Sequence, residues 1–151
     1  MSKAVMPKAA ILYGHGINAD RELADAFMAA GAQAERIPVK RLVQQPEILA
    51  QYQLLAFPGG FSFGDHLGSG LVLAHWMREH LREAIDAFVN RGGLIIGICN
   101  GFQVLVKMGV LPNLEKDWEP QVSLVHNMSG RFIDTWVPVE WNAANNSPWI
   151  S

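Results

Sequence analysis

Short apolar runs alternate with amphipathic stretches along the first two thirds of the chain. Runs of β-type residues predict strands at residues 9–13, 34–39, 54–57 and 94–96. Apolar residues at helical spacing predict helices at residues 20–30, 71–80 and 81–90, and a short one at 47–51. Repeated strand–helix units joined by short turns are typical of an α/β protein with a doubly wound, mostly parallel sheet of the flavodoxin-like type.

The pattern changes after residue 113. Residues 121–126 alternate apolar and polar side chains, and residues 131–139 are rich in β-branched and aromatic residues. We therefore expect two further strands, joined by a turn at residues 127–130. The whole chain of 151 residues is long enough for one domain with a sizeable core.

Composition narrows the classes of function. The net charge of −2 gives no electrostatic reason to expect binding to nucleic acid or to an anionic membrane. No apolar run approaches the roughly 20 residues that a membrane-spanning helix needs, and the run at residues 9–13 is too short for a signal peptide. The single cysteine, Cys99, excludes an internal disulfide and suits a reducing compartment, so we expect a cytoplasmic protein.

The strongest chemical signal is the segment Gly97-Ile98-Cys99-Asn100-Gly101, a cysteine version of the G-x-S-x-G nucleophile elbow. It follows a predicted buried strand and precedes a short predicted helix that Gly109 closes. In such an elbow the nucleophile has a strained backbone, the flanking glycines relieve crowding, and the helix N-terminus favours a thiolate. A lone cysteine is more commonly a small buried apolar residue, but this setting favours a reactive Cys99.

Two glycine-containing loops follow predicted strands at the same edge of the sheet. Gly14-His15-Gly16-Ile17-Asn18 favours a tight turn over a phosphate site, with Asn18 or Asp20 capping the next helix. In Pro58-Gly59-Gly60-Phe61-Ser62-Phe63-Gly64-Asp65, the adjacent glycines can present backbone N–H groups to an oxyanion. An ordinary glycine turn, with Asp65 or Ser69 capping the helix after it, explains this loop equally well.

Four segments together give the chain a resemblance to the class I glutamine amidotransferases. Within that class it is most similar to the glutaminase components of phosphoribosylformylglycinamidine synthases, which act in purine biosynthesis. The segments are Gly16-Ile17-Asn18-Ala19-Asp20-Arg21-Glu22 (similar to G-x-N-x-D-x-E), the 58–65 loop (similar to PGGFSYGD), Gly97-Ile98-Cys99-Asn100-Gly101-Phe102-Gln103 (similar to GxCNGFQ) and Asn127-Met128-Ser129-Gly130-Arg131-Phe132 (similar to NxSxRF). Many class I amidotransferases share the elbow in looser form, whereas the second and fourth segments narrow the resemblance to these synthases.

The resemblance implies that Cys99 attacks the side-chain amide of glutamine, which releases ammonia and leaves a glutamyl thioester for water to hydrolyse. The implied oxyanion donors are backbone N–H groups at Gly60, Phe61 and Asn100. The implied glutamine-binding residues are Gln103, Ser129, Arg131 and Phe132. Ammonia would pass to a synthetase subunit or domain that uses ATP and magnesium, whereas the glutaminase step needs no metal or other cofactor.

The chain also departs from the family. The family takes its base and its orienting acid from a later H-x-E segment, and none occurs before Ser151. We therefore expect residues 1–151 to be roughly the first two thirds of a single amidotransferase-like domain, incomplete at its C-terminal end. His15 and His66 stand where the family has Pro and Tyr, so neither is carried over as a base, and Gly68 stands where the family has Arg.

Two alternatives stay open. The first is a non-catalytic or degenerate amidotransferase-like chain that serves as a binding subunit. The second is a PfpI-like cysteine hydrolase. Those hydrolases commonly place His directly after the nucleophile, so Asn100 argues against the second alternative.

Overall fold

The computed structural model describes residues 6–142 and 146–149, and its centre is a parallel four-stranded sheet. The strands are β1 (Lys8–Tyr13), β2 (Gln33–Pro38), β3 (Leu54–Phe57) and β4 (Leu94–Gly97). They lie in the order β2-β1-β3-β4, and every pair is parallel. This order confirms the doubly wound, flavodoxin-like class predicted from the sequence.

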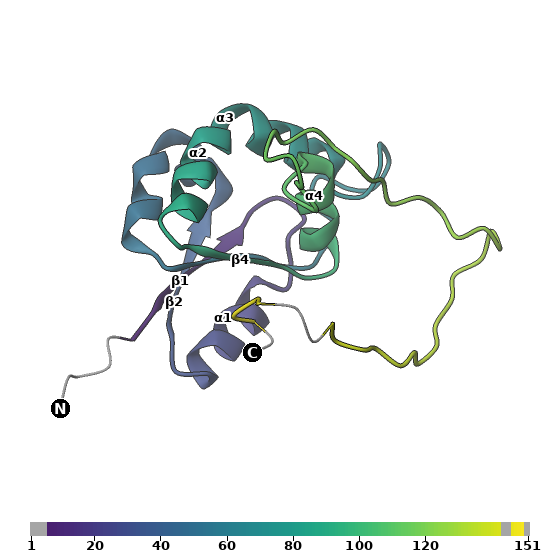
Figure 1. Cartoon of the computed structure of the whole chain (residues 1–151), viewed down its shortest axis with the longest axis horizontal. Helices are drawn as coiled ribbons and strands as arrows, with labels where there is room; N and C mark the ends of the chain where they lie inside the picture. The colour runs from purple at the N-terminus through teal and green to yellow at the C-terminus, as the bar shows by residue number, and fades with distance from the viewer. Residues whose placement is uncertain (1–5, 143–145, 150–151) are drawn as a thin grey trace.

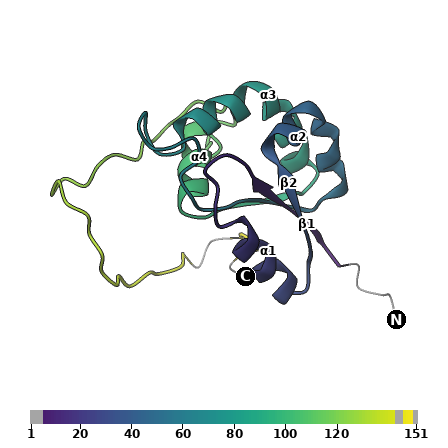
Figure 2. The same cartoon turned by 180° about the vertical axis from the view of Figure 1, so that it is seen from behind.

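Helices cover both faces of the sheet (Figures 1 and 2). They are α1 (Asp20–Ala29), α2 (Val39–Gln44), the 3₁₀ helix η1 (Pro46–Gln51), α3 (Leu71–Asn90) and α4 (Asn100–Met108). In both views α1 lies alone on one face, and α2, α3 and α4 lie on the other.

The alternation of side chains along β1 divides the core into two parts. Ala10 and Leu12 face the larger part, which packs against α2, η1, α3 and α4. Ala9 and Ile11 face the smaller part under α1. The sheet is therefore thickly covered on one face and thinly on the other.

β4 is only half-buried along its length, although its apolar sequence predicts a strand buried on both faces. It pairs with β3 on one side, and no strand of the described residues pairs with its other side. Ile95 packs against the larger core and Ile96 against the smaller one. The partial exposure thus comes from the open edge of the strand rather than from its side-chain pattern.

Some local predictions are wrong. The two helices expected at residues 71–90 form one continuous helix, α3. Neither Asn18 nor Asp20 caps α1: the N-cap is Ala19, and the Asp20 carboxylate forms an ion pair with Arg36 of β2. The N-cap of α3 is Gly70, so Asp65 and Ser69 do not cap that helix either.

The chain leaves the folded body after Trp118, whose buried indole N–H donates to Asp86 Oδ1 at 2.7 Å. The strands predicted at residues 121–126 and 131–139 do not form, and Figures 1 and 2 show this segment running well away from the sheet. The predicted turn at residues 127–130 is present, with the Gly130 N–H donating to the Asn127 carbonyl at 2.8 Å. Strands require neighbouring strands for their backbone hydrogen bonds, and no strand of the described residues pairs with this segment. Within the described residues, no helix combines the length and the apolar character needed to cross a membrane.

Candidate active site

Cys99 occupies the sharp turn between β4 and α4. It is the N-cap of α4, with φ 52° and ψ −114°. A non-glycine residue in this region of backbone space carries a strain of about 1–3 kcal/mol. The structure therefore confirms the strained strand-to-helix turn expected from the sequence.

The glycines on either side of Cys99 are required by close packing. A Cβ atom on Gly97 would lie 2.6 Å from Leu105 Cδ1 and 2.9 Å from the carbonyl carbon of Gly101. A Cβ atom on Gly101 would lie 2.0 Å from the carbonyl oxygen of Phe57 in β3. The absence of these side chains allows α4 to start directly against the end of the sheet.

The Cys99 side chain is exposed and lies beside the glycine loop that follows β3. A Cβ atom on Gly59 would lie 3.4 Å from Cys99 Cβ, so the two backbones meet without a gap. In the described part of the chain, the thiol makes no hydrogen bond and is not paired with an imidazole or a carboxylate. The nucleophile position is therefore formed, but this part of the chain does not supply it with a base.

The loop after β1 and the loop after β3 are joined by backbone contacts. The Phe61 N–H donates to the Gly16 carbonyl at 2.7 Å, and the Asn18 N–H donates to the Gly59 carbonyl at 3.3 Å. Ile17 and Gly60 form an antiparallel bridge between these two bonds. The loop beside Cys99 is thus held in place by the other glycine loop of the same sheet edge.

Because of this pairing, the three backbone N–H groups predicted to bind the oxyanion differ in whether they already donate a hydrogen bond. The Phe61 N–H is occupied by the Gly16 carbonyl, so it is not free to bind an oxyanion in this conformation. The N–H groups of Gly60 and Asn100 donate no hydrogen bond within the described residues. These two N–H groups therefore differ from that of Phe61, which is already occupied.

A buried polar network fixes the first turn of α4 to the same loop. Asn100 Oδ1 accepts hydrogen bonds from the Ser62 N–H at 3.1 Å and from Ser62 Oγ at 2.7 Å. Asn100 Nδ2 donates to Gln103 Oε1 at 3.2 Å. Ser62 lies within the PGGFS-like loop, and its role in holding the Asn100 side chain was not predicted from the sequence. Its role depends on a contact with a residue 38 positions away.

The structure places Gln103 in the first turn of α4, bonded to Asn100 of the elbow, but it does not bring Ser129, Arg131 or Phe132 there. Gln103 also lines a pocket of about 210 Å³ together with residues of the 68–69 loop and of the 124–126 segment. Ser129, Arg131 and Phe132 lie farther along the projecting segment, where their side chains are exposed. Their hydrogen bonds are local, such as the one from the Arg131 N–H to Ser129 Oγ at 3.3 Å.

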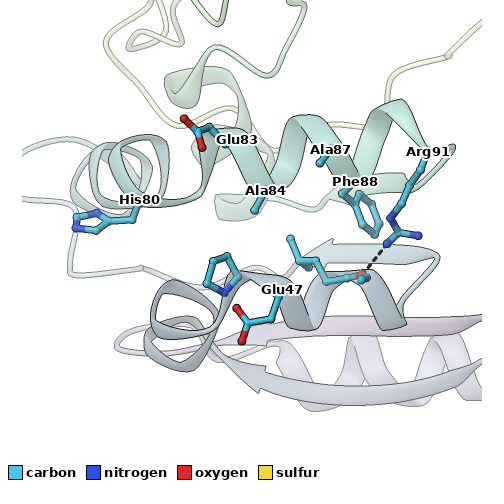
Figure 3. A pocket seen from close by; sticks show the side chains of 10 residues that line it. Glu47, His80, Glu83, Ala84, Ala87, Phe88 and Arg91 are labelled. Carbon is cyan, nitrogen blue, oxygen red and sulfur yellow. Dashed lines mark hydrogen bonds between the residues drawn. The ribbon is translucent and has the colours of Figure 1, made fainter.

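Another hollow lies away from the carboxyl ends of the strands. A groove of about 460 Å³ runs between η1 and the second half of α3, and Figure 3 shows Glu47 and Arg91 on its two sides. One nitrogen of Arg91 donates to the carbonyls of Leu49 and Tyr52 at 2.6 and 2.7 Å, so this side chain joins the two elements. The groove includes no residue of the elbow. No cluster of three or more His, Cys, Asp or Glu side chains in the described residues is placed to hold a metal ion.

A strained cysteine between a parallel strand and a helix, against a glycine loop, has the geometry of a nucleophile elbow on a doubly wound α/β fold. Residues 6–151 match the family described as the CobB/CobQ-like glutamine amidotransferase domain, and the chain belongs to this family. The match confirms the resemblance to class I glutamine amidotransferases that the sequence motifs indicate.

Several relatives are similar over most of this chain. It is 49% identical over 129 residues to the phosphoribosylformylglycinamidine synthase subunit PurQ of Dehalococcoides mccartyi, covering 85% of this chain and 50% of that protein. It is 37% identical over 139 residues to the subunit of the same name from Methanococcus maripaludis, covering 91% of this chain and 51% of that protein. The chain spans about half the length of the curated relatives it matches.

A solved structure gives the same result for the fold. The structure of PurLQS from Thermotoga maritima aligns with a TM-score of 0.67 and 34% sequence identity. The alignment covers 88% of this chain and 54% of that one. The sheet and its helices thus follow the arrangement of a solved member of a PurLQS assembly.

Proposed function

We propose that this chain is the nucleophile-bearing part of a glutaminase that supplies ammonia for the synthesis of formylglycinamidine ribonucleotide. The observation that carries the proposal is the strained Cys99 against Gly59, together with the N–H groups of Gly60 and Asn100, which donate no hydrogen bond within the described residues. The relatives' printed name, a subunit of phosphoribosylformylglycinamidine synthase, supports the same reaction.

In the proposed reaction, the Cys99 thiolate adds to the side-chain carbonyl carbon of glutamine. The carbonyl oxygen becomes an oxyanion, which accepts hydrogen bonds from the N–H groups of Gly60 and Asn100. Collapse of the intermediate breaks the C–N bond, and ammonia leaves once its nitrogen has received a proton. Water then hydrolyses the glutamyl thioester and regenerates the thiol.

In this proposal, glutamine is bound by Gln103 on α4 and by Ser129, Arg131 and Phe132 of the projecting segment, residues 121–139. The last three are assigned by the resemblance of their segment to NxSxRF. In this proposal the segment folds over the elbow when glutamine binds. The hydrogen bond between Asn100 and Gln103 supports a positioned Gln103.

The chain needs a base that the described residues do not supply to Cys99. We propose that residues 1–151 belong to one longer amidotransferase domain, whose later part supplies the His and the acidic residue. The length of the curated relatives, about twice the span matched here, supports this. The glutaminase step needs no cofactor, whereas the partner synthetase would use ATP and magnesium in the cytoplasm. The whole enzyme is then an ATP-dependent amidotransferase.

The test is labelling by a glutamine-like electrophile, a diazoketone analogue of glutamine, followed by intact-mass measurement. Because Cys99 is exposed, iodoacetamide serves as the reference reagent for simple accessibility. The full-length protein should take one diazoketone label at Cys99, and Cys99→Ala should take none and hydrolyse no glutamine. Gln103→Leu should lower diazoketone labelling but not iodoacetamide labelling. Glutamine turnover at the wild-type rate in Cys99→Ala would refute the nucleophile assignment.

A second candidate function is favoured by the unpaired thiol of Cys99: a non-catalytic subunit that binds the synthetase. It requires that the full-length protein take up iodoacetamide but no diazoketone label. It also requires that Cys99→Ala bind the synthetase as wild type and leave its glutamine-dependent activity unchanged. A glutamine-dependent activity that disappears in Cys99→Ala would exclude this candidate.

A further inference from the structure

A further pocket, of about 190 Å³, opens at the carboxyl edge of the sheet, and its lining includes no residue of the elbow. Its lining comes from the ends of β1 and β2, the start of α2, the loops that follow β1 and β3, and the first part of α3. The lining residues are Tyr13, Gly14, His15, Ile17, Pro38, Val39, Lys40, Phe63, Leu73 and Trp76. Neither Cys99 nor any residue proposed to bind glutamine or its oxyanion belongs to this set.

The pocket has an aromatic wall. The ring of Phe63 contacts the imidazole of His15, with centroids 5.7 Å apart, and meets the Trp76 ring edge-on, with centroids 6.2 Å apart. Val39 and Leu73, both nearly inaccessible to solvent, add aliphatic surface. A planar ring entering this space would contact aromatic faces and edges on one side and aliphatic side chains on the other.

The described lining carries a positive charge, on Lys40, and no negative charge. Lys40 is exposed and forms no ion pair within the described residues. The nearby Arg36 stacks on Tyr13, with its guanidinium carbon 4.9 Å from the ring centroid, and is paired with Asp20. No carboxylate occurs in the described lining, so a negative group on a ligand would meet an unpaired ammonium.

The position in the sheet also favours ligand binding. In open α/β sheets, ligands bind outside the carboxyl ends of the strands, where the direction of strand addition reverses. In the order β2-β1-β3-β4 that reversal lies between β1 and β3. The loops that follow these two strands supply His15, Ile17 and Phe63 to the pocket.

We propose that this pocket binds a small planar aromatic anion, a single ring that carries a carboxylate or a phosphate. An apolar cavity on the order of 150 Å³ holds benzene, so a pocket of about 190 Å³ has room for one ring with a short substituent. The ring packs against Phe63 and Trp76, and the anionic group lies at Lys40. The proposal does not depend on the glutaminase activity, because binding is measured without glutamine.

The probes are nicotinate and nicotinamide, which share a ring and differ in charge. Backbone amide shifts are followed during titration of each into the 151-residue protein. Nicotinate should shift residues 14–17 and 39–40 saturably, with a Kd on the order of 1 mM, and nicotinamide should bind about fivefold more weakly. Equal affinity for the two probes, or no saturable shift at these residues up to about 10 mM, would overturn the proposal.

Matched variants locate the site. Lys40→Gln should weaken nicotinate binding about fivefold and leave nicotinamide unchanged. Lys8→Gln, which removes the same charge at the opposite end of β1, should change neither. An equal loss in both lysine variants would show a general charge effect and overturn the assignment.

A second pair of variants tests the aromatic wall. Trp76→Leu should weaken both probes, whereas Trp136→Leu, on the projecting segment, should weaken neither. Circular dichroism confirms folding, and Phe63→Leu, at a 40% exposed position, replaces Trp76→Leu if the latter unfolds. Wild-type binding in the folded wall variant would refute the proposed ring contact.

Discussion

Replacing Gly101 by alanine is the sharpest test of the elbow packing. Gly101 lies inside α4, and its φ is not in the left-handed region, so helix propensity alone predicts that alanine stabilises the protein by about 1 kcal/mol. The structure predicts the opposite sign. The added Cβ would lie 2.0 Å from the Phe57 carbonyl oxygen, and ordinary contact begins at 3.4 Å, so the two elements must separate by about 1.4 Å.

α4 has to move rather than β3, because β3 is held between β1 and β4. Moving α4 disturbs the packing of its own buried side chains, Val104 and Leu105, against the core. Overpacking of this kind costs about 1–3 kcal/mol, and the rigid backbone on both sides places Gly101→Ala near the upper end, at about 3 kcal/mol.

Guanidinium unfolding followed by circular dichroism gives the free energy of unfolding of each variant. Gly14→Ala is the matched control, because a Cβ there meets nothing closer than 3.7 Å and its φ is not in the left-handed region. Its stability should stay within about 0.5 kcal/mol of wild type. A Gly101→Ala protein as stable as wild type, or more stable, would refute the argument that a close backbone approach requires this glycine.

Three further outcomes follow from the same structure. Cys99→Gly should be more stable than Cys99→Ala by about 1–2 kcal/mol in denaturant unfolding, because glycine tolerates φ 52° and ψ −114°; equal stabilities would contradict the strain. Ser62→Ala removes a buried hydroxyl donor to Asn100 Oδ1 and should cost about 1–2 kcal/mol, and an unchanged unfolding midpoint would argue against that bond. Burial, together with a hydrogen bond to Glu35, raises the pKa of Tyr52 from 10.0 to about 12. The folded state therefore keeps a proton that the unfolded state loses, so the free energy of unfolding should fall between pH 10 and about pH 12. Tyr52→Phe should lack this part of the pH dependence, and an identical slope in the variant would refute it.

Three strands of the sheet, β1, β3 and β4, could be predicted because each is a local apolar run that ends at or just before glycine or proline. Pro38 at the end of β2 is typical of an edge strand, and β2 lies at an edge of the sheet. The helix α2 was missed because its six residues span fewer than two turns, too few for a periodic signal, and Val39 continued the preceding apolar run. The predicted side-chain cap of α1 is wrong because of a long-range contact: the Asp20 carboxylate forms an ion pair with Arg36 of β2.

The candidate site likewise has some features that the sequence predicts and others that it does not. The Cys99 elbow was predictable because its motif lies within five consecutive residues after an apolar strand. The role of Ser62 was not, since it depends on a contact with Asn100 across two loops. Ser129, Arg131 and Phe132 carry a recognisable motif, but a motif does not place a segment against the body. The alternating pattern around them predicted strands, and alternation produces a strand only where a neighbouring strand supplies hydrogen bonds.

The pairing of the two glycine loops has a consequence for protein engineering. Gly16 and Gly60 face each other so closely that a Cβ on Gly16 would lie 2.1 Å from the Phe61 carbonyl oxygen, and one on Gly60 would lie 2.5 Å from the Gly16 carbonyl oxygen. The backbone of each loop thus fixes the conformation of the other. A designer who transplants the loop at residues 58–64 into another α/β scaffold must carry the turn at residues 14–18 with it. Recombination between relatives should likewise keep both segments from one parent.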